Sequence, residues 1–250
     1  MMARIRMQSM LLVGLTLLFL VSSSLAVEAA VLQNNASYYI NTAHSMAATF
    51  KAGTNVSLRP DGSVASGTIA QNNSFYINTA RSMAATFLAG TGVSFTPQGS
   101  VASGTIAQNN SFYINTARSM AATFQAGTGV SFTPQGSVVS GTIAQNNSFY
   151  INTARSMAAT FQAGTEVSFT PDGSVASGTI AQNNSFYINT ARSMAVTFRA
   201  GTPVSFREEG SVLSGTLATN TSLYTNVQHS QSGSFRAGTV VTFRPDGSVQ

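Results

Sequence analysis

The sequence has 250 residues and little charge: 12 Lys or Arg and 7 Asp or Glu give a formal net charge of +5 and a charged fraction of 8%, against about 25% in ordinary soluble domains. So small a basic excess argues against nucleic-acid binding, which usually relies on a dense basic patch. The chain has no cysteine, which excludes disulfides and a lipid anchor on an N-terminal cysteine, so stability must come from packing and backbone pairing.

Residues 1–29 have the pattern of a secretory signal peptide. Two arginines near the start are followed by an apolar run at 11–21, and small residues at Ala26 and Ala29 offer two cleavage sites. The apolar run is too short for a membrane-spanning helix, which needs about 20 residues. We therefore expect a mature chain that begins directly after one of these two alanines, has no transmembrane segment, and is secreted or otherwise extracytoplasmic, in a periplasm or at a cell surface.

The rest of the chain is one sequence repeated six times with a period of 37 residues. The stretch GTIAQNNSFYINTARSMA occurs four times without change, beginning at Gly67, Gly104, Gly141 and Gly178. A fixed period of this length is typical of solenoids, propellers and other arrays. We expect residues 30–250 to form a single repeat domain, with units at 30–66, 67–103, 104–140, 141–177, 178–214 and 215–250.

Each unit has the pattern of about four short β-strands. In the third unit, apolar residues at every second position predict strands at 112–114, 120–124, 130–132 and 138–143. The segments between them contain Ala-Gly-Thr and Thr-Pro-Gln-Gly, which are typical of tight turns, because Pro presets one dihedral angle and Gly permits positive φ. The sequence therefore predicts an all-β fold.

The apolar residues of one unit are too few for that unit to fold alone. At about 1.5–3 kcal/mol for each large side chain that becomes buried, eight such residues contribute on the order of 10–20 kcal/mol. Ordering 37 residues costs more, at ~1–2 kcal/mol each. We therefore expect the units to stabilise one another by stacking. In the third unit the predicted core residues are Ile106, Phe112, Ile114, Met120, Phe124, Val130, Phe132 and Val138.

Two architectures provide such stacking. In an open β-solenoid or β-roll the units follow one another along an axis, whereas in a six-bladed β-propeller they close into a ring. The divergent segment YTNVQHSQSGS at 224–234 favours the open array, as does a period shorter than the usual blade of about 40–45 residues. One observation favours the ring. The strand that spans each unit boundary is divided between the two chain ends, so residues 247–250 could pair with residues 30–32 or complete their strand. We prefer the open array and keep the ring as the alternative.

Two segments resemble a known repeat. VSLRPDGSVASGT at 56–68 and VTFRPDGSV at 241–249 are similar to the strand, turn and strand of MORN-type hairpin repeats, over about a third of each unit. The resemblance implies β-hairpins stacked in series. It implies no activity.

One tyrosine recurs in every unit and is the first candidate for a binding surface. If Phe112 and Ile114 face the core, then the Tyr113 ring between them faces outward, because successive side chains of a strand alternate. A row of exposed rings can stack on sugars. The structural alternative is that like aromatics on neighbouring strands stabilise one another by ~0.2–1 kcal/mol per pair. The row consists of Tyr39, Tyr76, Tyr113, Tyr150, Tyr187 and Tyr224.

A basic residue also recurs, a few positions after an asparagine that all six units share. Guanidinium groups hold carboxylates or phosphates through two hydrogen bonds, which suits an anionic polymer. The structural alternative is a row of solvated turn residues. The candidate binding residues are Arg81, Arg118, Arg155 and Arg192, and the first and last units have His44 and His229 in their place.

The inventory of reactive side chains argues against an enzyme. The chain has two histidines, no cysteine and seven acidic residues, and no carboxylate pair recurs. Asp61, Asp172 and Asp246 lie in Pro-Asp-Gly turns, where turn chemistry explains them. We therefore predict no catalytic residue, no metal site and no cofactor.

These patterns together predict a secreted or cell-surface repeat protein with a structural or adhesive role. Many weak copies of one site would give it avidity. The alternative function is that of a lectin-like β-propeller that binds a glycan. The expected partners are a cell-wall or cell-surface polysaccharide and, end to end, further copies of the chain.

Overall fold

The computed structural model describes residues 28–78, 83–115, 120–152, 157–189, 191 and 193–250. This part of the chain contains 24 β-strands and no helix. Accordingly, no helix in it is long and apolar enough to cross a membrane. The all-β prediction is confirmed.

Twelve strands form one long antiparallel sheet, in which neighbours follow the order of the chain. The first and last strands of this order, β1 and β24, are its two edges. The sheet consists of β1 (Glu28–Val31), β4 (Asn55–Leu58), β5 (Val64–Thr68), β8 (Gly92–Phe95), β9 (Val101–Thr105), β12 (Gly129–Phe132), β13 (Val138–Thr142), β16 (Glu166–Phe169), β17 (Val175–Thr179), β20 (Pro203–Phe206), β21 (Val212–Thr216) and β24 (Val240–Thr242).

The other twelve strands form six separate two-stranded hairpins, one in each unit. These are β2 (Ala36–Tyr39) with β3 (Ala47–Phe50), β6 (Asn73–Asn78) with β7 (Met83–Phe87), β10 (Asn110–Asn115) with β11 (Met120–Phe124), β14 (Asn147–Asn152) with β15 (Met157–Phe161), β18 (Asn184–Asn189) with β19 (Met194–Phe198), and β22 (Thr221–Tyr224) with β23 (Ser232–Phe235).

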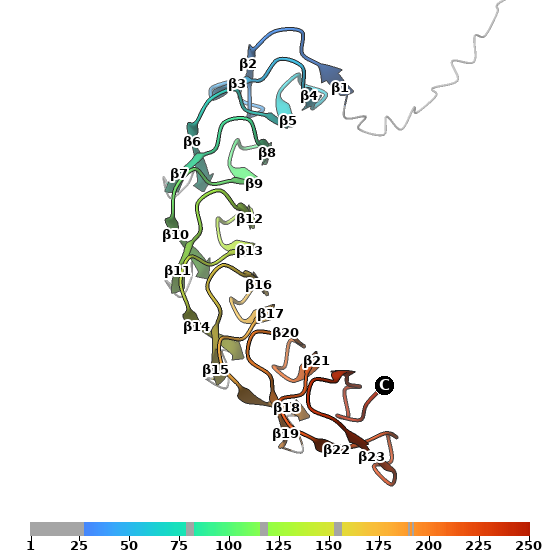
Figure 1. Cartoon of the computed structure of the whole chain (residues 1–250). Helices are drawn as coiled ribbons and strands as arrows, with labels where there is room; N and C mark the ends of the chain where they lie inside the picture. Colours follow the sequence, from blue (N-terminus) through green and yellow to red (C-terminus); the bar gives the residue numbers. More distant parts are fainter. Residues whose placement is uncertain (1–27, 79–82, 116–119, 153–156, 190, 192) are drawn as a thin grey trace, which may run out of the picture.

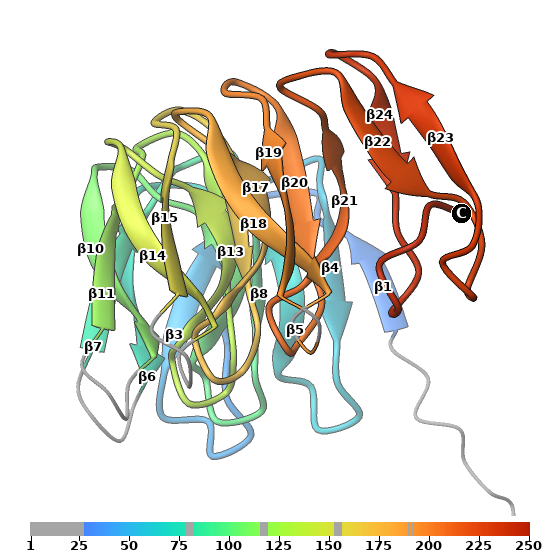
Figure 2. The same ribbon diagram turned by 90° about the horizontal axis from the view of Figure 1, so that it is seen from below.

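The units follow one another along an arc, with the hairpins on its outer side and the long sheet on its inner side (Figure 1). Figure 2 looks along this stack, with the C-terminal unit in front. The sheet joins units as well as strands: β13 pairs with β12 of its own unit and with β16 of the next. The open β-solenoid-like stack is therefore correct.

The alternative of a closed six-bladed propeller is wrong. β1 and the C-terminal unit, which contains β24, lie at opposite ends of the arc (Figure 1), and within the described chain β1 pairs only with β4 and β24 only with β21. The segment 247–250 stays in its own unit, where Val249 bridges to Phe243. The reason is that each inter-unit joint is a continuation of one sheet, which leaves its two edges far apart.

The core lies between the hairpins and the long sheet. In the third unit, Phe124 is fully buried, and the Phe112 ring packs on it at 5.9 Å between ring centroids and edge-on against Phe132 at 5.1 Å. Seven of the eight predicted core residues are buried, whereas Met120 is partly buried and packs against the core from its rim.

A glycine of the long sheet makes room for this phenylalanine. A Cβ placed on Gly141 would lie 2.7 Å from Cδ1 of Phe124, which is closer than carbon atoms can approach. The glycine that opens each inner repeat is therefore a packing requirement. The hairpin layer and the sheet can approach closely only because this position has no side chain.

Candidate functional site

The tyrosine row lies on the outer side of the hairpin layer. In the third unit Phe112 and Ile114 are buried, and Tyr113 between them points to the other face of β10. Four of the six tyrosines are 39–48% exposed, namely Tyr39, Tyr76, Tyr150 and Tyr224, and Tyr113 and Tyr187 are half-buried. Each unit adds two strands to the long sheet, so equivalent points of that sheet repeat every ~9–10 Å at 4.7–4.9 Å per strand. The rings lie on the outer side of the arc and are therefore farther apart than this.

The residue opposite each tyrosine in the hairpin is small. Tyr113 lies opposite Ala121, and the other inner units repeat this pair. In the first unit the partner is Ala47, and in the last it is Ser232. In the described residues, none of the six tyrosines makes a ring contact with another. The aromatic cross-strand pairs of the structural alternative are therefore not formed, and five of the six rings stand beside the methyl group of an alanine.

A hydroxyl pair accompanies each inner ring on the same face. The Ser111 and Thr123 hydroxyls are hydrogen-bonded at 2.8 Å, and the same pair recurs in the other hairpins up to the fifth. This pair was not predicted from the sequence, although Ser111 stands two residues before Tyr113 and so lies on the same face of the strand. In the third unit this face thus offers the Tyr113 ring, the Ala121 methyl group and two hydroxyls.

The predicted arginine row falls outside the described residues, since Arg81, Arg118, Arg155 and Arg192 all lie in the intervals that the structure leaves undescribed. The two histidines that replace them are described. His44 stacks on Tyr39 with 5.0 Å between ring centroids, and His229 stacks on Tyr224 at 4.6 Å. The two end tyrosines therefore each have an imidazole on one face.

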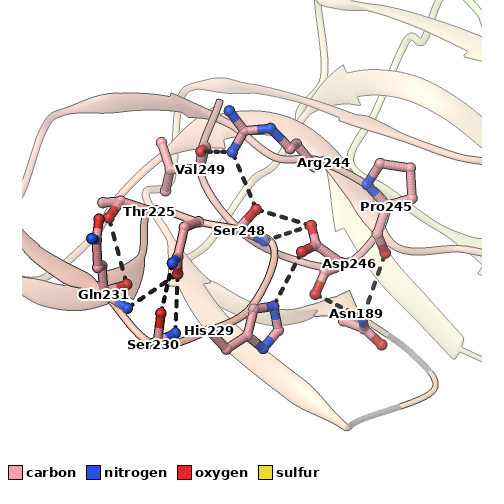
Figure 3. Close-up of polar contacts among 11 residues, drawn as sticks. Asn189, Thr225, His229, Ser230, Gln231, Arg244, Pro245, Asp246, Ser248 and Val249 are labelled. Carbon is pink, nitrogen blue, oxygen red and sulfur yellow. Dashed lines mark hydrogen bonds and ion pairs between the residues drawn. The ribbon is translucent and has the colours of Figure 1, made fainter.

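Each histidine also reaches an aspartate of its own unit. His229 points from the loop between β22 and β23 toward Asp246 in the turn after β24 (Figure 3), with 3.3 Å between Nε2 and Oδ2. At the other end His44 is 3.9 Å from Asp61. Burial raises the pKa of Asp246, but hydrogen bonds from Ser248 and the nearby His229 outweigh it, so the pKa of this carboxyl lies below its ordinary value.

In the second to fifth units the shared asparagine joins its unit to the next one. The buried Asn115 donates from Nδ2 to the carbonyl oxygen of Asp172 in the next unit at 2.6 Å, and its Cβ packs on the turn glycine Gly173, which has a φ of 85°. Asn152 makes the same bond to Glu209 at 2.8 Å. This position is therefore a structural joint.

A second regular surface, not predicted from the sequence, lies on the long sheet. On the inner side of the arc one hydroxyl of each sheet strand from β4 to β24 falls in a single row, because the register places Ser opposite Ser both within and between units. Neighbouring hydroxyls within a unit bond to one another at 2.6–3.0 Å. The row is Ser57, Ser66, Ser94, Ser103, Ser131, Ser140, Ser168, Ser177, Ser205, Ser214 and Thr242.

Among the described residues no group of three or more His, Asp or Glu lies close enough together to hold a metal ion. No protein-family model matches the chain, and no curated protein matches it. The likeness to MORN-type repeats stays a resemblance of hairpin pattern over about a third of each unit.

Proposed function

We propose that this protein is a secreted or cell-surface repeat protein with a structural or adhesive role, which binds a cell-wall or cell-surface polysaccharide through its tyrosine row. The observation that carries the proposal is the repetition of one outward-facing tyrosine, beside a small residue, in all six hairpins. The expected location outside the cytoplasm rests on the signal-peptide pattern of residues 1–29.

The chemistry of this face fits a polyhydroxylated ligand. A tyrosine ring stacks on the apolar face of a sugar while its hydroxyl bonds to water or ligand. The hydrogen-bonded Ser and Thr beside it can exchange their mutual bond for bonds to sugar hydroxyls, since a hydroxyl both donates and accepts. Because the rings lie on an exposed face, binding would be weak at one unit and would grow with the number of units engaged. The proposal is therefore of a binding protein without catalysis.

The test replaces Tyr76, Tyr113, Tyr150 and Tyr187 together by Ala. With ~1 kcal/mol for each stacked ring, one substitution changes little, whereas four should abolish retention on insoluble polysaccharide. The matched control replaces the same four residues by Phe, which keeps the rings and should keep most of the binding. Circular dichroism monitors the fold. Unchanged binding by the folded Ala variant contradicts the proposal, and loss of its fold returns the tyrosine row to a structural role.

A second quadruple variant asks whether the polymer is anionic. The four arginines of the basic row are replaced by Gln. Because exposed charges are screened over about 10 Å at 0.1 M salt, an anionic polymer predicts weaker binding mainly at low salt. If the Gln variant binds as the unchanged protein does at every salt concentration, the ligand of the tyrosine row is a neutral glycan.

A further inference from the structure

The two ends of the long sheet have matching geometries. β1 pairs with β4 as β5 pairs with β8, since Ala30 lies opposite Val56 in the way that Gly67 lies opposite Val93. β1 thus holds the place that the last sheet strand of a unit holds elsewhere in the stack. In the described chain its other edge pairs with no strand.

The opposite end shows the complementary feature. Phe50, Phe87, Phe124, Phe161 and Phe198 are 0% exposed, whereas the equivalent Phe235 is only partly buried. Asn226 is likewise half-buried, although the same asparagine is buried in the other five units. A hollow of about 500 Å³ lies beside the partly buried Phe235 ring, lined by Asn220, Thr221, Ser222, Ser234, Phe235 and Arg236.

We infer that the β1 end of a second copy of this chain packs on the β24 end of the first, so that copies join head to tail. Residues 28–32 correspond, six periods on, to the strand that would lie beside β24. The joint then repeats the contacts made between units inside the chain. β24 would pair with β1 as β20 pairs with β21, with Val241 opposite Ala30 as Val204 lies opposite Gly215.

Two contacts that join neighbouring units inside the stack are incomplete at its ends. Each end of the chain supplies one of the two partners. Arg59 donates from Nη2 to the carbonyl oxygen of Phe95 in the next unit at 2.5 Å. Arg244, at the same position in the last unit, bonds through Nη1 to Ser248 and Val249, and its Nη2 has no acceptor among the described residues (Figure 3). In the joint this Nη2 meets the carbonyl oxygen of Leu58 of the second copy.

The second of these contacts is the packing of a turn glycine on the shared asparagine. Gly99, Gly136, Gly173, Gly210 and Gly247 each lie against the shared asparagine of the preceding unit, with 2.7–3.0 Å from a Cβ placed on the glycine to the Cβ of that asparagine. Gly62, the first of the series, has nothing within 4 Å. Asn226 is the one shared asparagine without such a glycine, and the joint brings the two together.

Exposed valines at both ends fall into the same joint. Val240 in β24 is 71% exposed, and Val31 in β1 is 58% exposed. Continued by one residue, the register of β20 with β21 places these two valines directly opposite each other. Inside the stack a threonine occupies the place of Val31, in all five equivalent strands. An apolar pair therefore replaces a polar position only where the two ends would meet, which favours a second copy as the occupant.

Two steric conflicts between the ends have to be relieved before the copies can join. A Cβ on Gly215 would lie 2.6 Å from the Phe198 ring, so Ala30 of the second copy would press on Phe235, whose ring has to move aside. Val249 and Gln250 also occupy the register positions of residues 27 and 28. A mature chain that begins at Ala30 avoids this overlap.

The proposed contact joins two different ends of the chain and is not self-complementary. It therefore propagates, and further copies can add to make longer assemblies.

The test measures the mass of the mature chain from Ala30 by sedimentation and light scattering over a wide range of concentration. We expect the mass to rise with concentration. Val240→Lys should raise the dissociation constant at least about tenfold, because it buries an unpaired charge, and Ala30→Gly should lower it by relieving Phe235. The matched control is Val139→Lys on the inner strand β13, where the valine is 39% exposed, and it should associate as the unchanged chain does.

A covalent version uses the absence of cysteine from the sequence. In the variant with Val31→Cys and Val240→Cys, oxidation of the dilute protein should give a ladder of disulfide-linked multimers, because directly opposite residues have Cα atoms within reach of a disulfide. The variant with Val31→Cys and Val139→Cys should give far fewer. A single-chain mass at every concentration, equal effects of the two lysine variants, weaker association of Ala30→Gly, or equal ladders would each overturn the inference.

Discussion

Gly141→Ala tests the reason for the glycine in every repeat. The added Cβ would lie 2.7 Å from Cδ1 and 3.1 Å from Cε1 of Phe124, whereas carbon atoms attract one another at ~3.5–4.0 Å. Phe124 is fully buried and held by Phe112, so its ring cannot turn away freely. Overpacking of this kind costs about 1–3 kcal/mol, which should lower the urea midpoint by roughly 0.5–1.5 M at a typical slope of about 2 kcal/mol per M.

The assay is urea unfolding followed by circular dichroism, with Gly129→Ala as the matched control. Gly129 lies in the neighbouring strand β12 of the same sheet, has no atom within 4 Å of its Cβ position, and has no positive φ. This variant should be neutral or more stable by about 0.4–1 kcal/mol, because it restricts the unfolded chain. Adding Phe124→Leu to Gly141→Ala should cost less than the sum of the two changes. If Gly141→Ala is as harmless as Gly129→Ala, the packing argument is refuted.

Three further predictions concern the joints between units and the ends. Asn115→Ala leaves the carbonyl of Asp172 without its donor and should cost about 1–3 kcal/mol in urea unfolding; no loss would mean that the joint is formed elsewhere. Deletion of residues 104–140 should leave a folded five-unit protein with an unchanged circular dichroism spectrum per residue, and unfolding would contradict the open stack. The pKa of Asp246 is lower in the folded than in the unfolded chain, so its contribution is present above the unfolded value of about 3.9 and lost as pH falls through the lower folded value. In the Asp246→Asn variant the free energy of unfolding should therefore fall less steeply with pH below about pH 4. The same pH dependence in both proteins would contradict a contribution from this carboxylate.

The strands were the part of the fold most open to prediction. In the third unit the predicted strand at 120–124 is observed unchanged, and the other three differ from the prediction by at most two residues at either end, because alternating side chains and glycine turns are local signals. Ile143 was placed in the last strand, and it instead forms an isolated bridge with Phe124. There the chain leaves the long sheet to join the hairpin layer, a change of partner that no local pattern marks.

The contacts between units were not predictable in the same way. Asn115 and Asp172 lie 57 residues apart, which is neither one period nor two. The sequence shows that the asparagine recurs, but only the stacking of units shows which turn it reaches. The serine row was missed for the same reason, since it depends on the register between Ser131 and Ser140 and on the register of Ser140 with Ser168.

The candidate site was predictable in part. The outward direction of Tyr113 follows from alternation along one strand, whereas its small neighbour Ala121 comes from the other strand of the hairpin and depends on the register of the turn. The stacking of His229 on Tyr224 has a local cause that the sequence did not reveal, because a non-glycine residue at a φ of 56° is uncommon.

The central claim is that the tyrosine row acts as many weak copies of one site. Its most direct test is to measure the affinity for polysaccharide as a function of the number of units. Proteins with four, five and six units, made by deleting residues 104–177 or 104–140 or nothing, are checked for folding by circular dichroism and titrated with soluble fragments of the bound polysaccharide. The account predicts that affinity for long fragments falls with each unit removed, while affinity for short fragments is unchanged. An affinity for long fragments that is the same in all three folded proteins would contradict it, because it would show a single site.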